Sequence, residues 1–514
     1  MKVNKKSLLY GTVILTAANF IVRILGFIYR IFLSRMIGAQ GMGVIQLIFP
    51  VYMITITLTA TGIPVAVSRI IAQRKAIGDD LGIKRTLRIA ITAIIIIGSI
   101  ISLLVLLNVD MIATQILHEP RTHSALMVFF PCIIVTGLGA VLKGYFYGTK
   151  NIHPPAISEI VEQLIRIVFV LVLLVSFSDL NIEMYAVIVV LGMVIGEFTS
   201  LFYLHYHYHR HSKNACSSMR TPSKFALLKE VASIAAPVTF TRFISTLMMS
   251  LNAILIPQKL MSAGLSNSEA VGLFGIVSGM VMPLLFFPFT LISALSVIII
   301  PNLSESVMLK NWSNIRDKIS KSILLTCLTA FCCMGLLFPL GYPIGIVLYK
   351  EPAVGKYLGL LLWSLPFICL QHSLSSILNG LEKQNRAAMH FIIGGAIQLT
   401  CTYFLIPSLG IMGFVIGFMT SSILVTILNL WVIIPLTKLR IRWVAWFVKP
   451  ACAAYAMALM IYVSYAFLNK NGISAALSMI FSTFVGLAML SITLIIIGAM
   501  PSWLVKEVKK KVRR

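Results

Sequence analysis

Three arginines interrupt the first long apolar run of the chain, and their type and spacing suit the binding of an anion. Arg23, Arg30 and Arg35 lie within a segment of membrane-helix length. An arginine near the middle of a membrane helix costs about 2.5–3.5 kcal/mol on insertion scales, so it normally faces protein or a wet cavity. Arg23 and Arg30 are seven residues apart, which places both on one helix face. We therefore predict an anion site at this face; the alternative is that Arg30 and Arg35 only reach the lipid headgroups.

A second group of charges lies in the fifth apolar segment. Glu162 and Arg166 are four residues apart, and Glu159 precedes Glu162 by three, so the three side chains share one helix face. A buried pair of this kind can be purely structural, holding its helix in the bundle. Alternatively the pair lines a cavity, and Arg166 contributes to the anion site. Glu197, in the next apolar segment, is a lone acid that we interpret as structural.

The composition shows that the elements positioning these charges are membrane helices. Of the 514 residues 59% are apolar and only 11% are charged, whereas soluble domains carry about 25% charged residues. Fourteen apolar stretches have the length of a membrane helix. They cover 8–34, 43–72, 86–109, 122–148, 155–177, 183–205, 227–258, 270–301, 318–340, 354–381, 387–407, 411–436, 443–467 and 474–500. The predicted fold class is therefore an all-α membrane protein with fourteen transmembrane helices.

The net charge of +26 is unevenly distributed along the chain. Most of the 42 lysines and arginines fall in alternate connections, including Lys143 and Lys150 after the fourth helix, while acids such as Asp110 and Glu119 lie in the others. By the positive-inside rule we predict a multi-pass protein of the plasma membrane with both termini cytoplasmic. The basic tail 506–514 is expected to contact anionic membrane lipids. Nothing in the sequence resembles a nucleic-acid-binding module.

Sliding the chain along itself reveals an internal repeat. At an offset of 219 residues Arg23 falls on Arg242, and at 236 the segment 142–144 falls on 378–380. Each half would hold six helices, so the lobes are parallel and related by a pseudo-two-fold axis along the membrane normal, with two C-terminal helices outside the repeat. The predicted parts are the N-terminal lobe 1–205, a cytoplasmic linker 206–226, the second lobe 227–436, and the last two helices with the tail, 437–514.

Motifs for enzymatic chemistry are absent from the sequence. There is no phosphate-binding loop, zinc-protease motif, serine-nucleophile motif or pair of catalytic carboxylates. We therefore predict no catalytic residue, no cofactor and no metal. The histidines of His205–His211 could chelate a metal through their i,i+4 spacing, but we interpret this run as an aromatic interface belt.

Two parallel six-helix halves plus two helices, with arginines in the first, resemble the multidrug/oligosaccharidyl-lipid/polysaccharide exporter superfamily. Within it the chain resembles the polysaccharide-biosynthesis flippase family, which includes the stage V sporulation protein B group. The resemblance extends over essentially all 514 residues. The motifs that carry it are RILGFIYRIFLSRMIGAQGMGVIQL (Arg23–Leu47), GIPVAVSRIIA (Gly62–Ala72), LKGYFYGTKN (Leu142–Asn151) and SEIVEQLIRI (Ser158–Ile167).

The resemblance implies that a monomer exports a lipid-linked saccharide, an undecaprenyl-pyrophosphate precursor of peptidoglycan, by alternating access between two lobes. Cell-wall synthases would be its partners, and a role in sporulation is implied in the same way. The substrate-binding residues would be Arg23, Arg30, Arg242 and Arg166, with Glu162 and Glu159 as a supporting ion pair. The chain departs from lipid II flippases at Tyr29 and Arg30, where those proteins pair an arginine with an aspartate.

Membrane potential alone could drive such a cycle, because two negative charges moving outward release about 4.6 kcal/mol per 100 mV. A cation-coupled multidrug antiporter of the same fold is the alternative. That function needs intramembrane acids, and only Glu159, Glu162 and Glu197 are available. A membrane glycosyltransferase or polymerase would need a substantial outer loop with catalytic side chains, and the connections are too short to provide one.

Overall fold

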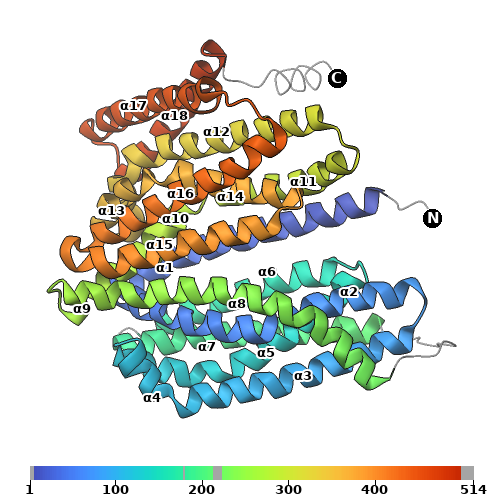
Figure 1. The fold of residues 1–514 in the computed structure, drawn as a ribbon. Helices are drawn as coiled ribbons and strands as arrows, with labels where there is room; N and C mark the ends of the chain where they lie inside the picture. Colours follow the sequence, from blue (N-terminus) through green and yellow to red (C-terminus); the bar gives the residue numbers. More distant parts are fainter. Residues whose placement is uncertain (1–4, 178–179, 212–222, 499–514) are drawn as a thin grey trace. The chain divides into compact units, whose positions relative to one another are not determined.

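The computed structural model describes residues 5–177, 180–211 and 223–498, and every regular element in these ranges is a helix (Figure 1). The predicted all-α membrane class is confirmed. Twelve of the described helices are long and apolar enough to cross a membrane, or thirteen if the bent pair Ala353–Leu362 and Leu365–Gly380 forms one span. All fourteen predicted ranges fall on helices in their described parts. The centre of the predicted linker, 212–222, and the predicted basic tail lie outside the described residues.

Packing divides the chain into two compact units, Met1–Gly275 and Ile276–Arg514. The first unit contains α1 (Lys5–Ala60), α2 (Gly62–Ala76), α3 (Asp80–Leu107), α4 (Val109–Met111), η1 (Ile112–Ile116), η2 (Pro120–Thr122), α5 (His123–Gly148), α6 (His153–Ser176), α7 (Ile182–His211), α8 (Lys224–Ser262) and α9 (Asn267–Phe274). From η3 (Gly275–Val281) onward follow α10 (Met282–Leu285), α11 (Phe289–Met308), α12 (Trp312–Ile344), η4 (Gly345–Tyr349), α13 (Ala353–Leu362), α14 (Leu365–Gly380), α15 (Gln384–Leu409), α16 (Ile411–Thr437), η5 (Val444–Val448), α17 (Lys449–Lys470) and α18 (Ala475–Ile496).

Helices α8 and α9 belong to the first unit because they pack against α1 and α2. The Thr57 and Thr246 hydroxyls share a hydrogen bond of 3.0 Å between α1 and α8. The Ser250 hydroxyl of α8 donates to the Pro50 carbonyl oxygen of α1 at 3.3 Å. The predicted lobe boundary at residues 206–226 describes bodies that move together, and it stays a prediction.

Helix α1 carries the first two predicted membrane spans on two arms that meet at Gly38. There φ is 68° and ψ is −174°, a backbone conformation that glycine adopts without strain. The second arm ends at Ala60, and α2 begins at Gly62, where the sequence shows a helix breaker. The arm before Gly38 carries the three predicted arginines, so the kink separates them from the packing of the second arm.

Apolar side chains fill the interior of the first unit and also cover its outside. On α3, Leu87 and Ile94 are buried, whereas Ile100, Leu103 and Leu107 are more than half exposed. A soluble protein rarely leaves a contiguous apolar surface of this kind in water. The exposed face of α3 is therefore a lipid-facing surface.

Equivalent helices in the two units pack in the same pairs, which supports the predicted repeat. Helix α2 packs on α5 and α6 on α7, as α11 packs on α14 and α15 on α16. A Cβ atom added to Gly144 of α5 would lie 2.6 Å from the Pro64 carbonyl oxygen, and one on Gly380 would lie 3.2 Å from the Ile300 carbonyl oxygen. Both members of these two contacts differ by the predicted offset of 236 residues.

Replacing Gly144 by alanine is expected to lower the free energy of unfolding by about 1–3 kcal/mol, because the new Cβ would overlap the backbone of α2. Denaturant unfolding in detergent micelles, followed by tryptophan fluorescence, measures the loss. Gly139→Ala on the same helix is the matched control, since no atom lies within 4 Å of its added Cβ. Equal losses in the two variants would contradict the close approach of α5 and α2.

Candidate functional site

Four charged side chains of α5 and α6 form what we call the charge cluster: Lys143, Glu159, Glu162 and Arg166. Glu162 contacts both cations, with 2.5 Å between its Oε1 and the Arg166 Nη2 and 4.0 Å between its Oε2 and the Lys143 Nζ. The Lys143 Nζ also lies 3.5 Å from Glu159 Oε1. The predicted proximity of Glu159, Glu162 and Arg166 is confirmed. Lys143, expected in a cytoplasmic connection, instead lies inside α5 because two carboxylates of α6 pair with it.

Two glycines on α7 let this helix approach α6 beside the charged pair. A Cβ added to Gly196 would lie 3.0 Å from the Glu162 carbonyl oxygen and 3.4 Å from the Arg166 Cβ. One added to Gly192 would lie 2.2 Å from the Val170 Cγ2. Larger residues on α7 would push α6 away, so these glycines fix the position of the charge cluster against α7.

The buried carboxyl group of Glu197 on α7 extends the charge cluster. Its side chain hydrogen-bonds the Thr136 side chain of α5, and it interacts electrostatically with Glu162, Lys143 and Arg166. Glu197 is thus not the isolated acid that the sequence suggested. Nearby cations are worth more to a buried carboxylate than to an exposed one, because the low local dielectric strengthens their attraction. Together these side chains place three acids and two cations inside the first unit.

Two buried hydrogen-bond donors beside the charge cluster have no partner among the described residues. They are the Tyr29 hydroxyl of α1 and the Arg166 Nε. Tyr29 is only 8% exposed, and both Arg30 and Arg166 act electrostatically on its hydroxyl. A buried donor without an acceptor costs about 1–3 kcal/mol, so such donors indicate a place that an acceptor oxygen completes. Sequence reasoning missed Tyr29, because an aromatic residue in an apolar run reads as core.

The other predicted arginines lie on α1 and α8 of the same unit. Arg30 is half-buried next to Tyr29, whereas Arg23 and Arg242 are exposed. The structure thus brings Arg166, Glu162 and Glu159 into direct contact and places Arg30 within electrostatic reach of Tyr29. That Arg23 and Arg242 face the same opening as this group stays a prediction.

The charge cluster has neutral counterparts in the second unit. At the offset of 236 residues, Lys143 corresponds to Asn379, Glu162 to Gln398 and Arg166 to Thr402. The repeat therefore keeps the packing of the helices but not their charges. Any chemistry that needs a guanidinium group at this depth belongs to the first unit.

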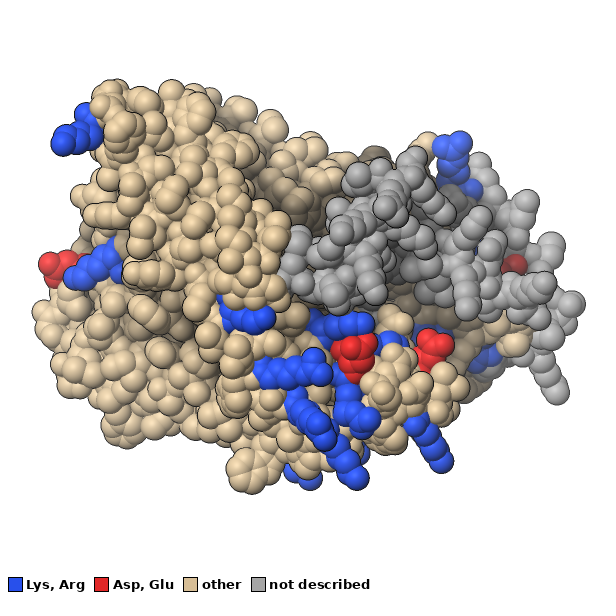
Figure 2. All heavy atoms as spheres, turned by 90° about the horizontal axis from the view of Figure 1, so that it is seen from above, with Lys and Arg blue, Asp and Glu red and all other residues tan. Residues whose placement is uncertain are grey.

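Lysines and arginines gather on one part of the face seen in Figure 2, with few acidic side chains among them. This uneven distribution is the pattern on which the positive-inside rule rests, and the cytoplasmic position of the termini stays a prediction. The rings of His205 and His209 lie 4.5 Å apart on α7. Across the described ranges, no group of three or more His, Cys, Asp and Glu side chains could hold a metal ion.

Comparison with known families gives two matches along the chain. Residues 8–307 match the model of the family described as polysaccharide biosynthesis protein, and residues 237–404 match that of the MatE family. The stage V sporulation protein B of Bacillus subtilis (strain 168) is 30% identical over 435 residues, which cover 83% of each chain. The lipid II flippase MurJ of the same organism is 25% identical over 420 residues, or 76% of each chain.

Solved structures share the fold at lower identity. A lipid II flippase MurJ in an inward closed conformation superimposes with a TM-score of 0.72 at 13% identity, covering 94% of this chain and 98% of that one. An inward-facing multidrug transporter of the MATE family in the MOP superfamily gives a TM-score of 0.66 at 15% identity, covering 83% and 99%. These similarities establish the helical architecture of a transporter.

Proposed function

The chain belongs to the polysaccharide biosynthesis protein family of the MOP superfamily, and on that premise we propose that it flips a lipid-linked oligosaccharide across the cell membrane. The proposed substrate is an undecaprenyl-pyrophosphate precursor of peptidoglycan, moved from the inner to the outer leaflet. Its similarity to a lipid II flippase supports this choice, and its similarity to a stage V sporulation protein supports a role in sporulation. The protein would act as a monomer with cytoplasmic termini, beside cell-wall synthases and without an enzymatic step of its own.

The observation that carries this proposal is the pair of unpartnered donors beside the charge cluster. A pyrophosphate offers several acceptor oxygens and about two negative charges, and planar guanidinium groups suit phosphate oxygens better than ammonium groups do. The Arg166 Nε and the Tyr29 hydroxyl would each donate to one such oxygen. Glu162 would hold the rest of the Arg166 guanidinium in place meanwhile. Arg23, Arg30 and Arg242 would complete the clamp.

Membrane potential supplies a driving force for this cycle. Moving two negative charges outward down an inside-negative potential releases about 4.6 kcal/mol per 100 mV, at roughly 2.3 kcal/mol per charge. The unloaded cationic site would be drawn back inward by the same field. The proposed mechanism therefore needs no nucleotide site.

Arg23→Ala and Arg242→Ala are each expected to slow transport by about ten- to a hundredfold, since a hydrogen bond to a charged group is worth about 1.5–3 kcal/mol. The assay follows a fluorescent undecaprenyl-pyrophosphate-linked sugar in proteoliposomes. Arg35→Ala is the matched control, because Arg35 is an exposed arginine on the same arm of α1.

Two results in these vesicles would contradict the proposal separately. Unchanged transport by both variants would remove Arg23 and Arg242 from the site. A transport rate indifferent to an imposed potential would remove the electrical driving force while leaving the substrate assignment in place.

A cation-coupled antiporter is the second candidate, and buried Glu197 is the observation that favours it. Together with Glu159 and Glu162 it makes acids outnumber cations around the charge cluster. Such a site would exchange protons or sodium for a cationic drug. Uptake of a cationic dye driven by a pH or sodium gradient, lost in Glu197→Gln, would support this function over the first.

A further inference from the structure

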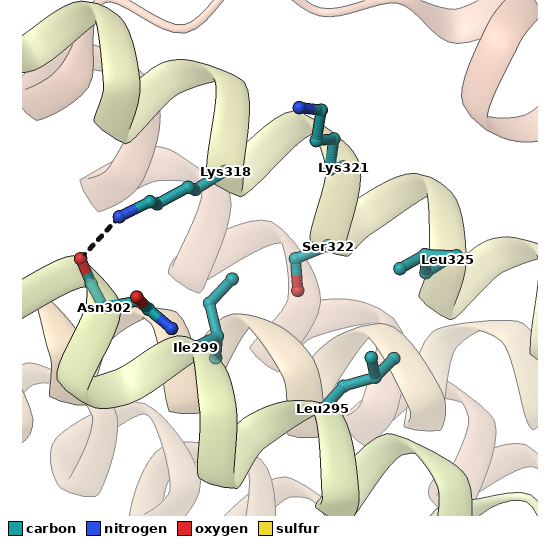
Figure 3. A pocket seen from close by; sticks show the side chains of 7 residues that line it. All are labelled: Leu295, Ile299, Asn302, Lys318, Lys321, Ser322 and Leu325. Atoms are coloured by element: carbon teal, nitrogen blue, oxygen red, sulfur yellow. Dashed lines mark hydrogen bonds between the residues drawn. The ribbon is translucent and has the colours of Figure 1, made fainter. Parts of the chain in front are cut away.

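A cavity of 340 Å³ lies between α11 and α12 in the second unit, away from the charge cluster and unused by the proposed function (Figure 3). Its walls combine basic, amide, hydroxyl and branched aliphatic side chains. They are Leu295, Ile299, Asn302, Lys318, Lys321, Ser322 and Leu325. A cavity with both polar and apolar walls fits an amphipathic ligand.

The polar end of this cavity is cationic. The Lys318 Nζ donates to the Asn302 carbonyl oxygen at 2.9 Å, as drawn in Figure 3, and to the Ser306 Oγ at 2.9 Å. An ammonium group has three N–H donors, so one remains for a ligand. The Lys321 Nζ lies 2.6 Å from the Asp317 Oδ2, and both of these side chains are largely exposed. Two cations and one acid leave a single positive charge at this end.

Both walls of the cavity change from polar to apolar in the same direction. Along α12, Lys318 and Lys321 precede Leu325. On α11 the order is reversed, with Leu295 and Ile299 before Asn302, and the neighbouring helix runs the other way. On the predicted orientation the cationic end lies at the cytoplasmic surface and the apolar end lies deeper in the membrane. A phospholipid of the inner leaflet has the same polarity profile.

We propose that this cavity binds an anionic phospholipid of the cytoplasmic leaflet. Its headgroup phosphate contacts Lys318 and Lys321, and its acyl chain packs against Leu295, Ile299 and Leu325. The single negative charge of a phosphodiester matches the single positive charge of the site, whereas a pyrophosphate carries about two. The ligand is thus a bulk membrane lipid rather than the transported molecule, and the site goes beyond the proposed flippase function.

Native mass spectrometry of the full chain, released from detergent with equal amounts of dioleoylphosphatidylglycerol and dioleoylphosphatidylcholine, tests this site. Wild type is expected to retain the anionic lipid at least about tenfold better than the zwitterionic one, and Lys318→Gln/Lys321→Gln to lose that preference. Because Lys318 also holds the end of α11, Leu325→Trp serves as a second variant that fills the apolar end and keeps both lysines. Lys310→Gln, an exposed residue outside the cavity, is the matched control and should bind like wild type.

Three outcomes would overturn the assignment. Equal retention of the two lipids by wild type would show that the site does not select charge. Full retention by both cavity variants would place the lipid elsewhere. Displacement of phosphatidylglycerol by equimolar undecaprenyl pyrophosphate would assign the cavity to the transported substrate instead. None of these results depends on transport activity, so they are distinguishable from a failure of the flippase proposal.

Discussion

Joining cysteines at Gln40 and Gly272 by a disulfide is expected to stop transport, with a drop of more than about tenfold. A Cβ at Gly272 of α9 would lie 3.5 Å from the Gln40 Cγ of α1, close to disulfide geometry. Backbones touch on either side, since a Cβ on Gly43 would lie 2.0 Å from the Val271 carbonyl oxygen. On the predicted orientation this contact lies at the outer end of both helices. Alternating access requires it to open before a substrate leaves on the outside.

The experiment uses the double variant Gln40→Cys/Gly272→Cys in a chain whose native cysteines are replaced by serine or alanine. Transport of the fluorescent lipid-linked sugar is measured before oxidation, after oxidation and after reduction by dithiothreitol. The single variants are controls for the substitutions themselves. Undiminished transport in the cross-linked protein would show that α1 and α9 stay together throughout the cycle, and alternating access at this contact would have to be abandoned.

Replacing Glu162 by glutamine is expected to lower the free energy of unfolding by about 3–5 kcal/mol. Breaking a buried ion pair leaves an uncompensated charge in a low-dielectric place, and Glu162 is the carboxylate that Arg166 and Lys143 share. Its side chain is 13% exposed and that of Arg166 is 19% exposed, so water screens little of this loss. Denaturant unfolding in detergent micelles provides the measurement.

Asp317→Asn is the matched control for this prediction. Asp317 and Lys321 form an ion pair with i,i+4 spacing like that of Glu162 and Arg166, but their side chains are 58% and 43% exposed. Removing an exposed pair typically costs less than about 1 kcal/mol. If both variants lost stability equally, burial of the charge cluster would not be the source of its effect.

Local spacing was sufficient to predict the Glu162–Arg166 pair, because residues four apart on a helix are neighbours whatever the helix packs against. The internal offset was likewise informative, and the equivalent contacts of Gly144 and Gly380 follow it. Lys143 and Glu197 could not be assigned to the charge cluster in this way. Their proximity depends on which helices pack together, and no periodicity within a single helix encodes that.

Tyr29 illustrates a second limit of sequence reasoning. Its ring fits the apolar pattern of α1, and only the packed structure shows that its hydroxyl is buried without an acceptor among the described residues. The breakers fared better, since α2 starts at Gly62 and the helix predicted at 270–301 is interrupted between α10 and α11. Glycine and proline act on the backbone locally, so their effect is visible in the sequence.

The three charges of α6 also bear on how the chain enters the bilayer during synthesis. A helix carrying Glu159, Glu162 and Arg166 is too polar to count among the apolar spans, and each charge costs about 2.5–3.5 kcal/mol at the centre of a lone helix. Helix α5 is made first and brings the ammonium group of Lys143, which neutralises the carboxylates of α6. The ribosome thus delivers the partner before the helix that depends on it, and α6 is expected to leave the translocon only together with α5.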